Sequence, residues 1–318
     1  MYNIAIIEKI HKDGLEVLDN NPNFKFEIIE DTSTENLIKK LPAFDACTLR
    51  VSKLDENILS HCSNLKAISR HGVGYDNVDL NYIKKKNISL LITATANAVA
   101  VAEHVISMFL TLSKSTKIYD QEVRDGKFKS NANKIQTFEM FNKNILIAGF
   151  GRIGKKLISR CISFDTNVYV YDPYVDENTI NKYGGKKVNS INDALKIADY
   201  ISLHMPLTNE TKNLIDYSVL KEMKSNSIIV NTARGGIINE IDLNKALNEG
   251  LIFGAGLDVF SKEPIENNNP LLKNKKIILS PHSATFTDEC TSRMGIETTK
   301  NIIDFFNNKL DKSMVVKL

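Results

Sequence analysis

The sequence of 318 residues has no tryptophan and only four cysteines, and the placement of the cysteines excludes one class of site. The cysteines (Cys47, Cys62, Cys161 and Cys290) stand too far apart for a CxxC metal or redox motif. This spacing favours buried, reduced thiols in a cytoplasmic protein. There is no run of 18 apolar residues, so we expect no membrane span. The apolar start, Met1–Ile7, lacks the basic region and cleavage site of a signal peptide.

The chain also has little net charge, because Lys and Arg together number 41 against 38 Asp and Glu. The net charge of +3 gives no reason to expect a nucleic-acid or membrane partner. The six histidines form no HExxH-like cluster, so we expect no metal site. Arginine is scarce, with seven residues among many lysines. Each arginine is therefore a useful pointer to a role that lysine cannot fill.

What is present is an alternation of short apolar runs with stretches of helical spacing, typical of parallel α/β sheets. A first series of expected strands covers Asn3–Ile7, Phe26–Ile29, Asp45–Leu49, Lys66–Ser69 and Ile88–Ile92. A second series covers Ile145–Ala148, Asn167–Tyr171, Tyr200–Leu203, Ile228–Asn231, Ala255–Val259 and Lys276–Ser280. The six strands of the second series predict a doubly wound sheet of Rossmann size. The length agrees with two domains.

Three segments lie outside these two series. Residues 97–114 are apolar on most sides of a helix, which predicts burial between domains or in a subunit interface. Residues 114–143 are polar and irregular and are expected to form a connection. The last expected helix, Asp288–Asn308, follows the completed second sheet. It could pack back on the first domain and make that domain discontinuous.

The sequence Gly149-Phe150-Gly151-Arg152-Ile153-Gly154 fits GxGxxG between an expected strand and an expected helix. In such a loop Gly149 permits a tight turn, Gly151 lets a pyrophosphate approach the backbone, and Gly154 lets helix and strand pack closely. Asp172 ends the next strand, where a carboxylate binds the ribose hydroxyls of NAD and repels the 2′-phosphate of NADP. An ordinary tight turn and a turn-forming Asp before Pro173 are the alternatives. We expect NAD as the cofactor.

Three later strand exits of the same sheet carry Arg234, Glu263 and His282. Ligands of open parallel sheets bind outside these exits. An arginine can hold a 2-oxo acid by its carboxylate and polarise its carbonyl. A histidine can donate the proton, and a carboxylate beside it keeps it protonated. The sequence therefore predicts hydride transfer. Singly, each residue could instead be a surface cation, a solvated loop charge or a core histidine.

Several ordered stretches resemble the D-isomer-specific 2-hydroxyacid dehydrogenase family, which includes phosphoglycerate, glyoxylate/hydroxypyruvate and sulfolactate dehydrogenases. The matching stretches, from about residue 45 to the end, are Ser69–Asp79, Ala102–His104, Gly149–Gly154, His204–Leu207, Asn231–Gly236, Gly256–Phe260 and Ser280–His282. The resemblance implies two Rossmann-like doubly wound parallel-sheet domains. It places a discontinuous substrate domain at 1–97 and 285–318 around an inserted NAD-binding domain at 98–284. It also implies a homodimer formed through the helix 97–114.

The resemblance assigns roles residue by residue. Arg234, Glu263 and His282 fall on the family's catalytic arginine, glutamate and histidine. Arg152 and Ile153 match residues at the cofactor phosphates, and Asp258 matches an acid that binds the nicotinamide amide. The remaining residues expected beside the cofactor are Pro206, Thr232, Ala233, Ser283 and Ala284. The backbone of Val73 and Gly74 matches amides that hold the substrate carboxylate, and Asn97 matches a residue near the substrate.

Two positions depart from the family pattern. Phe128 follows Gly126-Lys127 where the family often has Trp. Asn142 stands where a Gly usually precedes the first Rossmann strand, and Asn still tolerates a positive φ. Neither position is expected to affect the chemistry.

The substrate is the least determined feature. Arg50 and Arg70 both follow strands of the first series, and Arg50 resembles the substrate-anion arginine of phosphoglycerate dehydrogenases. This suggests a substrate with a second anionic group, whereas structural ion pairs are the alternative. A formate dehydrogenase of the same superfamily is disfavoured, because such enzymes place Gln at the position of Glu263. A catalytically idle NAD-sensing protein is the remaining alternative.

Overall fold

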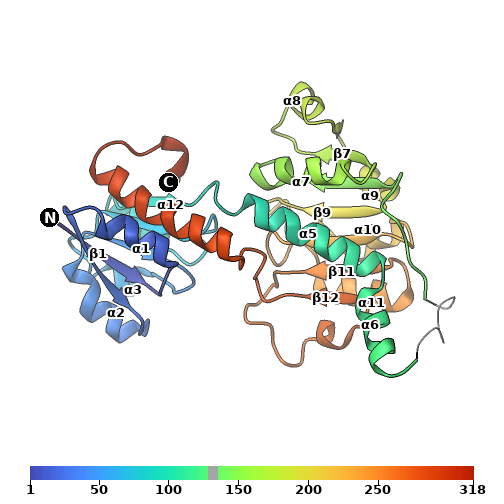
Figure 1. Ribbon diagram of the computed structural model, residues 1–318, viewed down its shortest axis with the longest axis horizontal. Coiled ribbons are helices and arrows are strands. Elements are labelled where there is room, and N and C mark those ends of the chain that lie inside the picture. The colour runs from blue at the N-terminus through green and yellow to red at the C-terminus, as the bar shows by residue number, and fades with distance from the viewer. Residues whose placement is uncertain (128–134) are drawn as a thin grey trace. The chain divides into compact units, whose positions relative to one another are not determined.

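The computed structural model describes residues 1–127 and 135–318, so Phe128 lies outside the described residues. These residues form two compact α/β units, coloured from blue to red along the chain in Figure 1. Unit 1 contains residues 1–97 and 286–318, and unit 2 contains residues 98–285. Within the described ranges, no helix is long and apolar enough to span a membrane. The same ranges hold no group of three or more metal-ligating side chains.

Unit 1 is built on a five-stranded parallel sheet with the order β2-β1-β3-β4-β5. Its strands are β1 (Tyr2–Ile7), β2 (Phe24–Ile29), β3 (Ala46–Leu49), β4 (Ala67–Arg70) and β5 (Ser89–Ile92). Its helices are α1 (Lys12–Asp19), α2 (Thr34–Lys40), α3 (Glu56–Leu59), α4 (Leu80–Lys85) and α12 (Asp288–Phe306), with short 3₁₀ turns at Leu41–Ala43 and Lys312–Met314. The predicted doubly wound α/β fold is confirmed for this unit.

The C-terminal helix α12 completes unit 1, and Figure 1 shows it beside α1. The two helices approach so closely that a Cβ on Gly14 would lie 2.6 Å from the carbonyl carbon of Gly295. The buried Ser69 hydroxyl of β4 donates to the Thr298 carbonyl of α12 at 2.8 Å. Chain segments from both ends of the sequence therefore form one core.

Unit 2 is built on a seven-stranded parallel sheet with the order β12-β11-β10-β9-β6-β7-β8. Its strands are β6 (Asn144–Ala148), β7 (Asn167–Tyr171), β8 (Lys186–Val188), β9 (Tyr200–Leu203), β10 (Ile228–Asn231), β11 (Gly254–Leu257) and β12 (Ile277–Leu279). Its helices are α5 (Ala98–Ser113), α6 (Thr116–Arg124), α7 (Arg152–Ile162), α8 (Glu177–Lys182), α9 (Ile191–Ile197), α10 (Tyr217–Glu222) and α11 (Glu240–Glu249), with a 3₁₀ turn at Pro270–Lys273.

Two elements of unit 2 correct the sequence-based expectation. The sheet has a seventh strand, β8, which was not predicted because it is a short edge strand with two lysines and one valine. Helix α6 lies within residues 114–143, which were expected to be only a connection. None of its residues is buried, so its polar composition concealed it. In contrast, Asn142 has φ 57°, which confirms that asparagine serves at this position.

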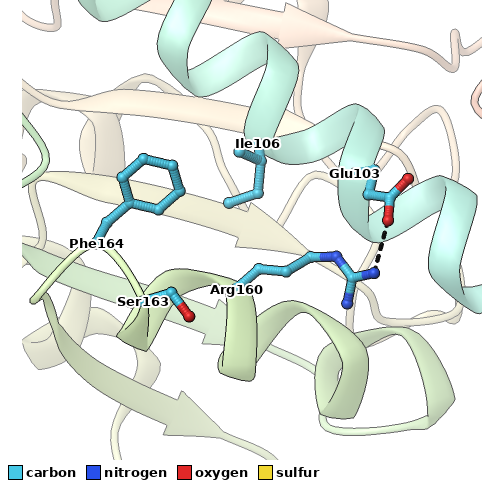
Figure 2. A pocket seen from close by; sticks show the side chains of 5 residues that line it. All are labelled: Glu103, Ile106, Arg160, Ser163 and Phe164. Atoms are coloured by element: carbon cyan, nitrogen blue, oxygen red, sulfur yellow. Dashed lines mark hydrogen bonds and ion pairs between the residues drawn. The ribbon is translucent and has the colours of Figure 1, made fainter.

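Helix α5 packs against α7 and against strands of the unit 2 sheet. Val105 and Phe109 of α5 are fully buried, whereas Glu103 is exposed. Glu103 accepts a hydrogen bond from Arg160 of α7 at 2.7 Å, as Figure 2 shows. All four cysteines of the chain are buried and none forms a disulfide, as the sequence predicted.

Candidate functional site

The glycine loop lies between β6 and α7, at the point where the strand order of unit 2 reverses direction. Gly149 has φ 100°, and a Cβ there would lie 2.6 Å from the carbonyl oxygen of His204. A Cβ on Gly154 would lie 2.5 Å from the Gly149 carbonyl oxygen. Gly151, by contrast, has no atom within 4 Å of its Cβ position. Two glycines are required by close packing, and the middle one leaves the backbone open to a ligand.

Asp172 follows β7 and is fixed to the glycine loop. Its Oδ2 accepts the Phe150 amide proton at 2.8 Å, and its Oδ1 accepts that of Tyr174 at 2.9 Å. A carboxylate accepts through about four lone-pair positions, so these two bonds leave acceptor capacity for hydroxyl groups. The arrangement suits a ribose and is unfavourable for a phosphate beside it.

The other residues expected to bind the cofactor are placed by the strand exits of unit 2. Arg152 and Ile153 form the first turn of α7, whose N-terminus favours phosphate charge. The Thr232 hydroxyl, just after β10, is buried without a hydrogen-bond partner, which is costly unless a ligand satisfies it. Pro206 and Ala233 follow β9 and β10. An open glycine backbone, a helix N-terminus and an orphaned hydroxyl fit a dinucleotide.

His282 and Glu263 are brought together from different strand exits. The His282 Nδ1 lies 2.8 Å from Glu263 Oε2, and Glu263 Oε1 accepts the Phe260 amide proton at 2.9 Å. Because an ionised carboxylate can only accept, His282 carries a proton on Nδ1. Its Nε2 is then the atom that can give or take a proton.

The charges around this pair set its proton affinity. The hydrogen bond to Glu263 raises the pKa of His282 above 6.5 despite partial desolvation, and the charges of Glu263 and Asp258 add to the rise. Partial burial alone would raise the pKa of Glu263. Its hydrogen bonds with His282 and the Phe260 amide, and the charges of His282 and Arg234, outweigh burial and lower it. The pair therefore favours an ionised Glu263 beside a protonated His282.

Arg234 lies on the loop after β10, close enough for its charge to act on both partners of the pair. Asn231 organises this loop: its side chain donates to the Arg234 carbonyl at 2.8 Å and accepts from the Ala233 amide at 3.0 Å. A Cβ on Gly235 would lie 1.9 Å from the Phe260 carbonyl carbon. Glycine at 235 thus lets the arginine loop lie against the loop that leads to Glu263.

The residues expected to bind substrate, Arg50, Arg70, Val73, Gly74 and Asn97, all belong to unit 1. The Arg70 guanidinium donates to three backbone carbonyls: Gly74 at 2.7 Å, Leu49 at 2.6 Å, and Arg50. Arg70 therefore connects the loop containing Gly74 to the end of β3. Its binding of substrate stays a prediction.

Arg50 makes a different set of contacts. One of its guanidinium nitrogens donates to the Lys9 carbonyl at 2.8 Å. An arginine side chain has five N–H donors, so this bond uses a small part of its capacity. Its binding of a second substrate anion also stays a prediction.

Two other histidines have properties that separate them from His282. Desolvation lowers the pKa of His204 to about 4 and that of His71 to about 4, with the Arg50 and Arg70 charges adding to the effect at His71. Both rings are neutral near pH 7 and unsuited to donate a proton there. The His204 amide donates to the Ala148 carbonyl at 2.7 Å, and the His204 carbonyl occupies the space that a Cβ on Gly149 would need.

Sequence reasoning assigned no role to two polar residues of this region. His104 of α5 and Ser280 after β12 lie 3.0 Å apart, between Nε2 and Oγ. A histidine on a largely apolar helix was the available signal, but its partner is 176 positions away in the chain. No local pattern identifies such a pair.

These features define a dinucleotide-binding α/β protein with a histidine–carboxylate pair at the cofactor edge of its second sheet. Residues 106–284 match the family model described as D-isomer specific 2-hydroxyacid dehydrogenase, NAD binding domain. The chain is 32% identical to a hydroxypyruvate reductase of Thermotoga maritima, covering 95% of this chain and 97% of that protein. The chain belongs to the D-isomer specific 2-hydroxyacid dehydrogenase family, and NAD is its cofactor.

Two further relatives show how far the similarity extends. A D-3-phosphoglycerate dehydrogenase of Archaeoglobus fulgidus is 32% identical over 95% of this chain, which spans only 56% of that protein's length. The solved structure of the D-lactate dehydrogenase of Aquifex aeolicus, in complex with NAD and lactic acid, has a TM-score of 0.85 at 28% identity. The superposition covers 99% of this chain and 99% of the lactate dehydrogenase chain. All three relatives carry enzyme names, which gives the idle-sensor alternative no support.

Proposed function

We propose that the protein transfers a hydride between NAD and C2 of a small D-2-hydroxy acid or the corresponding 2-oxo acid. The hydrogen bond of 2.8 Å between His282 and Glu263, beside Arg234 in the NAD-binding unit, carries this proposal. The cofactor supplies or accepts the hydride. In the reducing direction His282 Nε2 gives a proton to the carbonyl oxygen, and Glu263 stabilises the imidazolium before transfer. Arg234 holds the carboxylate and polarises the carbonyl.

The substrate class within this reaction follows from unit 1. We propose that the backbone amides of Val73 and Gly74 hold the substrate carboxylate and that Arg50 binds a second anion, a phosphate or sulfonate. The relatives support this range, because their names include phosphoglycerate and hydroxypyruvate. The contacts of Arg70 support a positioning role for it, because they hold the loop of Gly74 in place.

NADH oxidation with glyoxylate, hydroxypyruvate, phosphohydroxypyruvate and sulfopyruvate tests both proposals. For Arg50→Ala we expect KM to rise about 10- to 100-fold for phosphohydroxypyruvate and sulfopyruvate, which carry a second anionic group, since a hydrogen bond to a charged group contributes about 1.5–3 kcal/mol. KM for glyoxylate should change little. Arg50→Lys is the matched control, which keeps the charge without the planar fork and should fall between. An equal KM change for all four acids contradicts the role of Arg50. No turnover with any of them, with NADH bound tightly, contradicts dehydrogenase activity.

We also propose that two copies pair through α5. Ile106 of α5 is half-buried, and beside it Phe164 stays 37% exposed at the pocket shown in Figure 2. Apolar groups left together at a surface favour association. Sedimentation should give twice the chain mass of 35.7 kDa, and Ile106→Glu should reduce it to 35.7 kDa. A wild-type protein that sediments at the single-chain mass excludes the dimer.

A further inference from the structure

His104, a residue of α5, is connected by hydrogen bonds to the loop that carries His282. The Ser280 hydroxyl lies 2.6 Å from Asp258 Oδ1 and 3.0 Å from His104 Nε2. An ionised carboxylate can only accept, so Ser280 donates its single proton to Asp258. Ser280 can then only accept from His104, which must carry its proton on Nε2. The order of donation is therefore His104 to Ser280 to Asp258.

Asp258 uses the other end of this network to hold the backbone of residues 282–284. Its Oδ1 also accepts the Ser283 amide proton at 2.8 Å, and its Oδ2 accepts that of Ala284 at 3.1 Å. Its main-chain carbonyl accepts the His282 amide proton at 2.8 Å. The Asp258 side chain is 1% exposed, so losing one of these donors would be costly.

The backbone of His282 needs such support. Its φ is 52°, in the left-handed region, which costs a non-glycine residue about 1 kcal/mol or more. This conformation sets the direction of the imidazole toward Glu263. A rotation of the Asp258 carboxylate would loosen the amides of Ser283 and Ala284 and let His282 move toward ordinary backbone angles.

We propose that His104 is a positioning residue for the acid–base pair. By donating to Ser280, it keeps the serine proton directed at Asp258, and Asp258 holds His282 in its strained conformation against Glu263. The inference rests on the proposed dehydrogenase function. It means that the position of His282 also depends on a residue of α5, a helix that contributes no group to the reacting atoms.

The matched variants His104→Gln and His104→Asn test the proposal. The glutamine amide reaches the position of Nε2, whereas the asparagine amide reaches only that of Nδ1. We expect His104→Gln to keep kcat for 2-oxo acid reduction within about 3-fold and His104→Asn to lower it at least 10-fold. Ser280→Ala should resemble His104→Asn, and the double variant should be no worse than either alone, because both break one network.

A readout independent of turnover is the pKa of His282, measured by NMR titration of its imidazole. We expect His104→Asn and Ser280→Ala to lower this pKa, because a loosened loop weakens the hydrogen bond to Glu263, and His104→Gln to restore it. An unchanged His282 pKa, or additive losses in the double variant, overturns the proposal even if the protein is less stable. A wild-type protein that reduces no 2-oxo acid contradicts the proposed function instead, while the titration still tests the network.

Discussion

Replacing His282 with asparagine is expected to lower kcat for 2-oxo acid reduction about 10²- to 10⁴-fold, the usual contribution of a positioned general acid. Asparagine is the sharper choice than alanine, because it tolerates the φ of 52° and keeps a polar hydrogen beside Glu263. The substitution removes the Nε2 atom and the proton that it would donate. The Kd for NADH, measured by fluorescence titration, should stay within about 2-fold. A loss in kcat of less than 10-fold means that another group donates the proton.

In the proposed mechanism, the same pair sets the pH dependence of the wild-type protein. Because the pKa of His282 is raised above 6.5 by Glu263, the imidazolium needed for reduction persists to higher pH than for a free histidine. The rate of reduction should fall as the pH rises through this raised pKa. Oxidation of the hydroxy acid needs the neutral ring and should rise over the same range.

Glu263→Gln is the variant matched to that pH dependence. The glutamine oxygen can still accept from Nδ1, so the orientation is kept while the negative charge is lost. The fall in reduction should therefore move to lower pH. A profile of kcat/KM against pH that does not move shows that Glu263 does not control the histidine.

Replacing Arg234 with glutamine is expected to lower kcat/KM about 10²- to 10³-fold, the usual cost of removing one preorganised donor at a site of developing charge. Arg234→Lys should recover only part of this loss, because lysine supplies a charge without two parallel N–H donors. The fold should be kept, since Asn231 organises the loop through the Arg234 carbonyl and not through its side chain. Steady-state kinetics with a 2-oxo acid at saturating NADH measure the loss.

Arg234→Gln and Glu263→Gln can be distinguished by the direction in which each shifts the pH dependence of reduction. The charge of Arg234 lowers the pKa of His282, so Arg234→Gln should move the fall in reduction to higher pH. Glu263→Gln moves it to lower pH. If Arg234→Gln changes neither kcat/KM nor the profile, the arginine acts neither on the substrate nor on the acid–base pair.

Much of the fold was readable because parallel strands buried on both faces are continuous apolar runs. The expected strands Tyr200–Leu203 and Ile228–Asn231 are buried throughout and agree with β9 and β10 residue for residue. The expected strand Asn167–Tyr171 agrees equally with β7, in which the two valines are buried and the other residues are not. Strand β8 and helix α6 were missed for the opposite reason. No residue of either element is buried, and both are rich in polar and charged side chains, so neither contains the apolar run of a core element.

The candidate site likewise contains features that the sequence could predict and features that it could not. The placement of the candidate residues at strand exits could be predicted, because a strand followed by Gly149–Gly154, Asp172 or Arg234 brings them to one edge of the sheet. The contacts of Arg70 with backbone carbonyls could not, because carbonyl groups carry no sequence signal. The packing reason for glycine at 235 could not be predicted either, because it depends on the Phe260 backbone, which is distant in the sequence.

The sequence by itself therefore determined the class of fold and the dinucleotide loop, and it predicted an acid, its carboxylate partner and an arginine. Local patterns carry these, since periodicity, glycine spacing and strand exits are properties of neighbouring residues. Only the tertiary structure decided that His282 is strained and that His104, Ser280 and Asp258 form the network beside it. These groups are 22 to 176 positions apart. Pairing of β11 with β12 brings Ser280 to Asp258, and packing of α5 on the sheet brings His104 to Ser280.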